Sequence, residues 1–313
     1  MRERITKLLE ARYGLCVRTL EEVPAGWSAM ALRAQTDRGD LFVKVYDRNR
    51  PSTRVWIERL DAWLPVAQWL GENTPLAAHM SVAIRAEDGA VRVDDRELIL
   101  LVYPFIRGET LREARLTREQ ARALGRIVGT LHACPVKLPF PAERLTETYE
   151  FPFCTAMRAQ LGDDSARALV APHAALLGER IDELEARAAQ LKKDRPESVL
   201  CHTDIHGWNL MQAENLILVD WEGLLLAPPE ADLFSFTEAF FFGYAWDDIL
   251  LGYREVRPGF VLHEDILKTY RLRRRLEDID AFLESILSDN LAPDALAQST
   301  ALLTRECGLL RAT

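Results

Sequence analysis

The chain has 313 residues, of which 48% are hydrophobic and 28% are charged, and its net charge is −9 at pH 7. These values are typical of a folded globular protein large enough to bury a core without disulfides or metals. The acidic charge argues against nucleic acid or an anionic membrane as the main partner. Five cysteines without a CxxC pair favour reduced thiols, and no apolar run is long enough to cross a bilayer. We therefore expect a cytoplasmic protein.

The first hundred residues predict a small region of mixed helix and strand. Apolar residues spaced by three and four indicate helices, whereas short β-branched and aromatic runs bounded by turns indicate strands. The expected elements are a helix at 5–13, strands at 28–34 and 41–46, a helix from 51 to about 70, and strands at 80–85 and 98–105. A hinge is expected at about 103–108, where the last of these strands ends.

After Gly108 the pattern becomes mostly helical. Thr117 and Gln120 form the Thr-x-x-Gln pattern of a capping box at the start of a helix. The helical segments expected are 117–133, 166–193 and 264–287, with a β-like island at 199–220. The sequence therefore predicts an α+β protein in two parts: a small one, residues 1–106, with an antiparallel sheet and one main helix, and a larger, mainly helical one, residues 107–313.

The β-like island contains the pattern H-x-D-x-x-x-x-N, from His202 to Asn209, followed by an apolar strand that ends at Asp220. Phosphoryl transfer needs a carboxylate that orients the attacking hydroxyl and accepts its proton, and oxygen ligands that hold magnesium against the phosphates. Asp204 fits the first role, and Asn209 and Asp220 fit the second. His202, His206 and Asp220 could instead suggest a metal cluster, but the joint pattern favours phosphoryl transfer.

This pattern resembles the aminoglycoside phosphotransferase family, and the resemblance extends over most of the chain. Further similar segments are Leu41-Phe-Val-Lys44, Tyr103-Pro-Phe-Ile106, Leu226-Ala-Pro228 with Asp232-Leu233, and Arg275-Leu-Glu-Asp-Ile279. Among its subgroups, the one that phosphorylates spectinomycin is the most similar. The resemblance implies a bilobal protein-kinase-like fold, in which residues 1–106 bind the nucleotide and residues 107–313 carry the catalytic loop and the acceptor site.

The resemblance also implies roles for the residues of the pattern. Asp204 is expected to be the catalytic carboxylate, and Asn209 and Asp220 are expected to bind Mg²⁺. His202 is expected to brace the loop, and Asp232 to support it from the start of a helix. The phosphoryl donor is ATP or GTP, and the sequence does not distinguish the two.

Several residues of the first lobe are expected around this nucleotide. Lys44 lies in an apolar strand, the setting of the lysine that reaches the α and β phosphates in kinases. Glu58 or Asp61, on the following helix, is expected to pair with Lys44, and Glu58 is preferred. The remaining expected contacts are Gly26 and Ser28 with the phosphates, and Tyr103, Phe105 and Ile106 with the purine. The single glycine near Ser28 departs from the glycine-rich loop of protein kinases.

The acceptor is expected to be small. Only seven residues separate Asp220 from Pro228, which leaves no room for a regulatory activation loop and favours a small-molecule kinase over a protein kinase. The resemblance implies a cationic aminoglycoside or aminocyclitol, spectinomycin-like, as acceptor. The expected acceptor contacts are Glu222, Trp208, Glu277 and Asp278.

Two other functions stay open. One is a metabolic kinase of the same fold that acts on choline, homoserine or methylthioribose. The other is a catalytically silent ligand-binding protein, against which the presence of Lys44, Asp204, Asn209 and Asp220 argues.

Overall fold

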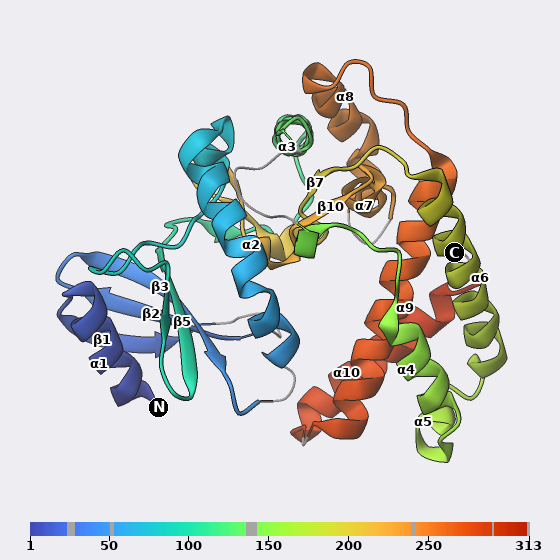
Figure 1. Ribbon diagram of the computed structural model, residues 1–313, viewed down its shortest axis with the longest axis horizontal. Coiled ribbons are helices and arrows are strands. Elements are labelled where there is room, and N and C mark those ends of the chain that lie inside the picture. Colours follow the sequence, from blue (N-terminus) through green and yellow to red (C-terminus); the bar gives the residue numbers. More distant parts are fainter. Residues whose placement is uncertain (24–28, 51–52, 136–142, 239–241, 290, 312–313) are drawn as a thin grey trace. The chain divides into compact units, whose positions relative to one another are not determined.

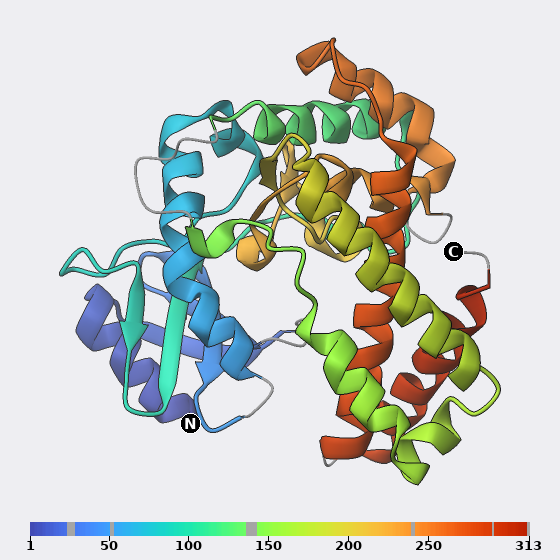
Figure 2. The same ribbon diagram turned by 45° about the vertical axis from the view of Figure 1, so that its right-hand side comes forward.

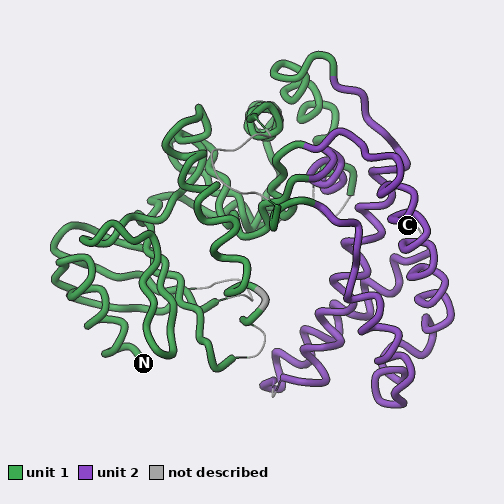
Figure 3. Tube along the Cα trace, viewed as in Figure 1, with its two compact units in different colours: residues 1–146, 199–226, 236–259 green, residues 147–198, 227–235, 260–313 purple. Residues whose placement is uncertain are grey.

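The structure is a computed structural model, and the residues it describes are 1–23, 29–50, 53–135, 143–238, 242–289 and 291–311. The chain divides into two compact units (Figure 3). Unit 1 comprises residues 1–146, 199–226 and 236–259, and unit 2 comprises residues 147–198, 227–235 and 260–313. The bounds of these units do not correspond to those of the expected lobes, residues 1–106 and 107–313. The division into lobes stays a prediction.

Unit 1 is built on a five-stranded antiparallel sheet (Figure 1). Its strands are β1 (Val17–Glu22), β2 (Met30–Thr36), β3 (Gly39–Asp47), β4 (Arg92–Asp94) and β5 (Leu98–Pro104), in the order β1-β2-β3-β5-β4. The polar turn between β2 and β3 closes with Thr36 opposite Gly39, which has a φ of 110°. Glycine tolerates this left-handed backbone at little cost, and the predicted hairpin is confirmed.

The two faces of this sheet carry different side chains, because successive residues of a strand point to opposite faces. One face packs with α1 (Arg2–Tyr13) into a hydrocarbon core that includes Val43 and Val45. Helix α1 lies beside the sheet in both ribbon views (Figures 1 and 2). The alternate residues of β3 include Lys44 and Tyr46, which therefore project from the other face. The core thus fixes the strand that presents the lysine.

Residues 80–85 do not form the strand that their apolar pattern predicts. The segment is held by single hydrogen bonds: the Ile84 N–H donates to the Val102 carbonyl at 2.7 Å, and Gln68 Nε2 donates to the Ala83 carbonyl at 2.7 Å. Conversely, β1 and β4 were not predicted. β1 is an edge strand with mostly exposed polar residues, so it lacks the apolar alternation that identifies a strand.

The other elements of unit 1 are α2 (Arg54–Asn73), η2 (Pro75–His79), β6 (Glu109–Thr110), α3 (Arg118–His132), η3 (Glu143–Leu145), β7 (Val199–Cys201), η4 (Gly207–Asn209), β8 (Leu210–Gln212), β9 (Leu216–Leu218), η5 (Trp221–Gly223), η7 (Gly243–Ala245) and α8 (Trp246–Val256), while β10 (Leu225–Ala227) and η6 (Phe234–Thr237) reach its boundary. The capping box is confirmed: the Gln120 N–H donates to Thr117 Oγ1, and the Thr117 N–H donates to Gln120 Oε1. Short strands β6, β8 and β9 form one small sheet, and β7 pairs with β10. Strands β7 and β8 flank the loop of residues 202–206 and the helix η4, and β9 lies directly before Asp220.

Unit 2 is helical. It contains α4 (Pro152–Leu161), α5 (Asp164–Leu169), α6 (Ala174–Asp194), α7 (Glu230–Leu233), α9 (Glu264–Ser288) and α10 (Pro293–Leu309). The helix expected at 166–193 is therefore two helices, since Pro172 lies in the break and cannot continue a helix. None of the described helices is long and apolar enough to span a bilayer. The antiparallel sheet followed by a mainly helical remainder confirms the α+β class.

Candidate active site

The H-x-D-x-x-x-x-N segment forms a loop between β7 and β8, and His202 braces it. The Asp204 N–H donates to His202 Nδ1 at 3.3 Å, so the proton of the neutral ring is on Nε2, which donates to the Val219 carbonyl at 3.1 Å. The ring is fully buried and packs edge-on against Trp221, with centroids 4.8 Å apart. Because both nitrogens are engaged within the protein, this geometry argues against His202 as a metal ligand.

Asn209 connects Asp204 to the end of β9. Its Nδ2 donates to both the carbonyl and the Oδ2 of Asp204, each at 2.9 Å. The backbone carbonyl of Asn209 accepts from the N–H of Val219, the residue before Asp220, at 2.9 Å. Since a carboxylate only accepts, the amide nitrogen must face Asp204 and Oδ1 is the atom left to act as a ligand. The structure therefore brings the three predicted motif residues together in unit 1.

His206 contacts both Asp204 and Asn209, and its Nε2 lies 3.4 Å from Asn209 Nδ2. Its Nδ1 accepts from the Trp208 N–H at 3.2 Å, and its Nε2 lies 3.4 Å from Asp204 Oδ1. The indole of Trp208 is 54% exposed, and the Arg112 guanidinium lies 5.1 Å from its ring centroid. Trp208 thus presents an aromatic surface four residues from Asp204.

The backbone around the loop is strained. Thr203 and Asp220 have φ of 69° and 66°, and Arg112, which lies against the loop, has φ of 52°. Such left-handed conformations cost about 1–2 kcal/mol for residues other than glycine and cluster at functional sites. Thr203 is held by a hydrogen bond from its Oγ1 to the Gly223 carbonyl at 2.9 Å.

Two glycines allow the chain segments to approach this loop. A Cβ at Gly207 would lie 1.7 Å from the Arg112 carbonyl oxygen. A Cβ at Gly223 would lie 2.4 Å from Thr203 Oγ1 and 2.6 Å from the His202 carbonyl oxygen. Neither position has space for a side chain without backbone movement, so both residues fix the loop by close packing.

Lys44 reaches two carboxylates from β3. Its Nζ lies 3.0 Å from Asp220 Oδ1 and also forms an ion pair with Glu222 Oε1. Burial alone lowers the pKa of Lys44, but Asp220 and Glu222 outweigh it and raise that pKa above its ordinary value. Burial raises the pKa of Glu222, and the charge of Asp220 adds to this, while Lys44 opposes it.

Tyr46 completes this cluster, since its hydroxyl donates to the same Glu222 Oε1 that Lys44 contacts. Tyr46 is fully buried and Glu222 is only 4% exposed. Tyr46 was not among the predicted site residues, although its spacing of two from Lys44 on a strand places both on one face. Glu222, expected to contact the acceptor, is buried in the Lys44 cluster.

Glu58 does not pair with Lys44, contrary to the preferred expectation. The Glu58 carboxylate accepts from Arg54, one turn earlier on α2, at 2.8 Å, and Asp61 pairs with Arg92 at 2.8 Å. The Glu58 side chain is 58% exposed on α2, where Arg54 of the same helix binds it. Whether Glu58 contributes to nucleotide binding stays a prediction.

The expected purine-binding segment follows β5. Burial raises the pKa of Tyr103, and the Phe105 ring lies 4.6 Å from the Arg33 guanidinium. The Phe105 N–H donates to the Asp40 carbonyl at 3.2 Å, and the Ile106 carbonyl accepts from the Gly108 N–H at 3.1 Å. Gly26 and Ser28 lie outside the described residues.

Three further predicted residues belong to unit 2. Asp232 is buried in α7. On α9, Glu277 pairs with Arg273 at 2.8 Å and Asp278 pairs with Arg274 at 3.0 Å. The roles expected for these residues stay predictions.

The oxygen donors of unit 1 suit magnesium. Asp220 offers a carboxylate and Asn209 offers Oδ1, the hard ligands that this ion prefers. Asp220 and Glu222 share one ammonium, so the contacting groups carry a net negative charge. A cation is therefore favoured at this cluster on charge as well as on ligand type.

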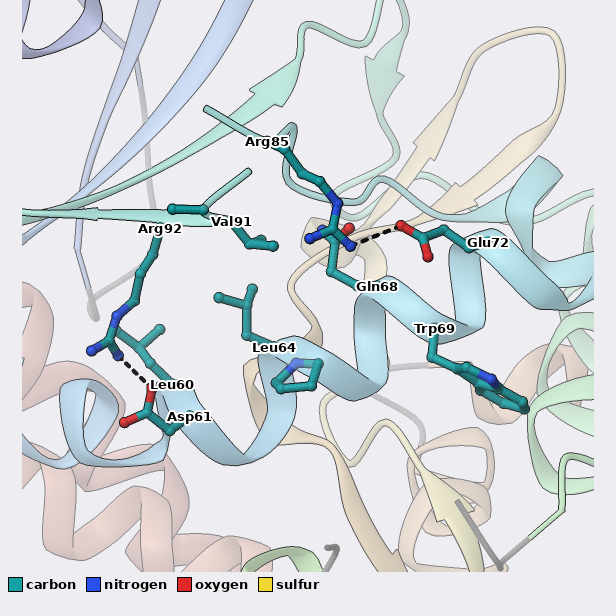
Figure 4. Close-up of a pocket in the computed structure, with 11 residues that line it drawn as sticks. Leu60, Asp61, Leu64, Gln68, Trp69, Glu72, Arg85, Val91 and Arg92 are labelled. Carbon is teal, nitrogen blue, oxygen red and sulfur yellow. Dashed lines mark hydrogen bonds and ion pairs between the residues drawn. The ribbon is translucent and has the colours of Figure 1, made fainter. Parts of the chain in front are cut away.

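A surface pocket of about 470 Å³ lies elsewhere on unit 1, between α2 and residues 85–92 (Figure 4). Leu60, Leu64 and Val91 contribute its apolar part. Its charged groups pair with each other, Arg92 with Asp61 and Arg85 with Glu72, as the dashed lines in Figure 4 show. Of the residues expected around the nucleotide, its lining includes Asp61, the alternative partner of Lys44, which pairs with Arg92 instead.

The fold is shared with solved phosphotransferase structures. Spectinomycin phosphotransferase APH(9)-Ia, in complex with ADP and spectinomycin, is 20% identical with a TM-score of 0.77, covering 99% of this chain and 97% of that one. The microcompartment-associated aminopropanol kinase is 17% identical with a TM-score of 0.63, covering 99% and 96%. Macrolide 2'-phosphotransferase MphH from Brachybacterium faecium is 18% identical with a TM-score of 0.61, covering 96% and 98%.

Sequence comparison gives the family. Protein StrN of Streptomyces griseus is 29% identical over 160 residues, which are 45% of this chain and 49% of StrN, so the match spans about half the length of that relative. Residues 19–265 match the phosphotransferase enzyme family. This match confirms the predicted resemblance and the predicted class of enzyme, a phosphotransferase. Since it covers well over half of the sequence, the chain belongs to the phosphotransferase enzyme family.

Proposed function

We propose that the protein transfers the γ-phosphoryl group of magnesium-bound ATP or GTP to a hydroxyl of a small cationic acceptor, an aminoglycoside or aminocyclitol antibiotic. The observation that carries this proposal is the set of hydrogen bonds that joins Asp204, Asn209 and the end of β9, with Lys44 bound to Asp220 at that end. Base, metal ligands and phosphate-binding lysine are the parts that this reaction requires.

Each residue has a distinct part in the proposed reaction. The acceptor oxygen bonds to the γ-phosphorus as the bond from phosphorus to the bridging β,γ-oxygen breaks, and the nucleoside diphosphate leaves. Asp204 orients the hydroxyl and accepts its proton, while Lys44 donates to the phosphates. Asn209 and Asp220 would hold magnesium, which supplies positive charge against the phosphate oxygens. His202 and Asn209 fix Asp204, so its carboxylate needs little reorganisation.

Two observations bear on the acceptor class. Trp208 offers an exposed aromatic surface beside Asp204, which suits the apolar face of an alicyclic ring. APH(9)-Ia binds spectinomycin, and that likeness motivates the antibiotic acceptor. A second candidate is a metabolic kinase acting on a smaller amino alcohol. The arginines paired with Glu277 and Asp278 favour it, because neutralised carboxylates attract a polycation less strongly.

The test is magnesium-dependent release of ADP or GDP in the presence of spectinomycin, aminoglycosides, a macrolide, choline, homoserine, methylthioribose and aminopropanol. We expect acceptor-stimulated release, and Asp204→Asn should lower kcat about a thousandfold because the proton acceptor is lost. Nucleotide affinity of Asp204→Asn should stay within about twofold, since Asp204 does not contact the nucleotide in this proposal. Stimulation by choline or aminopropanol alone would favour the second candidate, and an active Asp204→Asn enzyme would exclude the base role.

A further inference from the structure

We propose that Tyr46 is a positioning residue for the phosphate-binding lysine and that it acts through Glu222. This inference rests on the proposed function, because it assigns a task to Lys44 in nucleotide binding. Its basis is geometric: the Tyr46 hydroxyl and Lys44 Nζ converge on one carboxylate oxygen, Glu222 Oε1, in the interior of unit 1.

The two acids bound to Lys44 differ in whether they can keep this contact when a nucleotide binds. Asp220 is 31% exposed at its side chain and is the proposed metal ligand, so its contact with Lys44 must be given up or shared. Glu222 is 5% exposed at its side chain and has no such second task. Glu222 is therefore the acid that keeps Lys44 in place during binding, in the position that the sequence analysis assigned to Glu58.

A carboxylate that anchors a lysine in the interior must itself be fixed. Tyr46 supplies a hydrogen bond to Glu222, and its ring centroid lies 5.9 Å from Lys44 Nζ. Hydrogen bonds to charged groups in the interior are strong and directional. The Tyr46 hydroxyl therefore fixes the orientation of the Glu222 carboxylate and weakens the attraction of this carboxylate for Lys44. Without it, Glu222 would bind Lys44 more tightly and in a less defined geometry, and Nζ would be less available to phosphate.

The first experiment compares Tyr46→Phe with Tyr253→Phe. Both tyrosines are fully buried in unit 1, and both donate or accept through the hydroxyl, Tyr253 with His132 Nδ1 at 2.8 Å. Phe keeps each ring and removes only the hydroxyl. We expect Tyr46→Phe to raise the KM for the nucleotide and the Kd for fluorescent mant-ATP by about three- to tenfold, with the acceptor KM unchanged. Tyr253→Phe should leave all three constants within about twofold. Equal effects of the two variants would mean a structural role only.

The second experiment tests whether Tyr46 acts through Glu222. Glu222→Gln should weaken mant-ATP binding more than Tyr46→Phe does, because Lys44 then has only Asp220 as a charged partner. In the Glu222→Gln background, Tyr46→Phe should add less than about twofold, since the two changes share one pathway. Multiplicative effects in the double variant would overturn the proposal.

The two proposals fail in distinguishable ways. If the wild-type protein binds neither mant-ATP nor mant-GTP with magnesium, the proposed function is wrong. If it binds nucleotide and Tyr46→Phe binds as well as wild type, the proposed function stands and the role of Tyr46 is wrong. Circular dichroism and thermal unfolding of each variant identify any loss that comes from misfolding.

Discussion

Two buried carboxylates, one in each compact unit, are neutralised in opposite ways. Glu222 is 4% exposed and, among the described residues, shares one cation, Lys44, with Asp220. Glu306 is 5% exposed and pairs with two cations, Arg275 and Arg305. The two carboxylates are almost equally buried. Around Glu222, two carboxylates share one cation, whereas around Glu306, one carboxylate contacts two cations.

This difference separates a site from a structural contact. The charges around Glu306 are fully satisfied by guanidinium groups within unit 2 and join α9 to α10. The group around Glu222 keeps a net negative charge beside the partly exposed Asp220. Charge that is left incompletely neutralised costs stability and is retained where a ligand will supply the balance.

The largest expected effect comes from removing the charge of Asp220. Asp220→Asn should lower kcat/KM on the order of a thousandfold, ~4 kcal/mol of transition-state stabilisation, because a proposed metal ligand is lost. The free energy of unfolding should rise by up to about 1 kcal/mol, since Lys44 then serves Glu222 alone. Urea unfolding and magnesium-dependent mant-ATP binding measure the two effects. A large loss of stability would contradict the assignment of Asp220 to an incompletely neutralised site.

Glu306→Gln should give the opposite result. Two arginines would lose their carboxylate, one of them buried, so the free energy of unfolding should fall by about 3 kcal/mol. Activity per folded molecule should not change, because neither arginine is part of the proposed site. The matched variant is Glu183→Gln, which removes a carboxylate paired with Arg180 and Arg187 on the surface of α6 and should cost less than about 1 kcal/mol.

A third acid sharpens the comparison, with a smaller effect. The buried Oδ1 of Asp280 accepts no hydrogen bond from the described residues, and burial, aided by Glu284 and Glu277, raises the pKa of Asp280 to about 6. The Asp280 carboxyl therefore binds its proton more tightly in the folded protein than in the unfolded chain, where the pKa of an aspartate is about 4. The resulting stability is fully present below about pH 4 and is lost as the pH rises through 6.

The substitution Asp280→Asn should remove this pH dependence. Because the group is partly exposed, we expect a difference of about 1 kcal/mol in the free energy of unfolding between pH 5 and pH 7 for wild type that is absent in the variant. Urea titrations at the two pH values measure it. An identical pH profile for both proteins would contradict the raised pKa.

The sequence predicted which residues of the candidate site lie together where these residues are close in the chain. His202, Asp204 and Asn209 fall in one loop, and Asp220 follows strand β9 by two residues, so their spacing predicts that they lie together. Their roles stay predictions. The lysine cluster was different. Lys44 and Tyr46 each meet an acid 176 residues away, and no local pattern indicates which of several acids a lysine will reach. Glu58 was preferred for its place on α2, but an arginine of the same helix binds it.

The fold was predictable in a similar way. Helices α1, α2, α3 and α9 and the β2–β3 hairpin carry strong local periodicity and were predicted, whereas α4, α8 and α10 were not. The exposed edge strand β1 was missed because its partners, rather than its own pattern, make it a strand. Residues 80–85 have a strand-like pattern, yet their contacts are isolated: Met80 bridges to Leu218, Ile84 donates to the Val102 carbonyl, and the Ala83 carbonyl accepts from a glutamine side chain.

The strained backbone at Thr203 has a consequence for how this protein can evolve. Glycine there would accept a φ of 69° and relieve about 1–2 kcal/mol of backbone strain, a gain that its greater freedom in the unfolded chain offsets in part. The same change would remove the hydroxyl that ties the loop to Gly223. Selection for heat resistance and selection for turnover therefore pull this position in opposite directions. A library screened only for survival at high temperature should therefore contain Thr203→Gly variants with a lower kcat, because the loop that carries Asp204 has lost its hydrogen bond to Gly223.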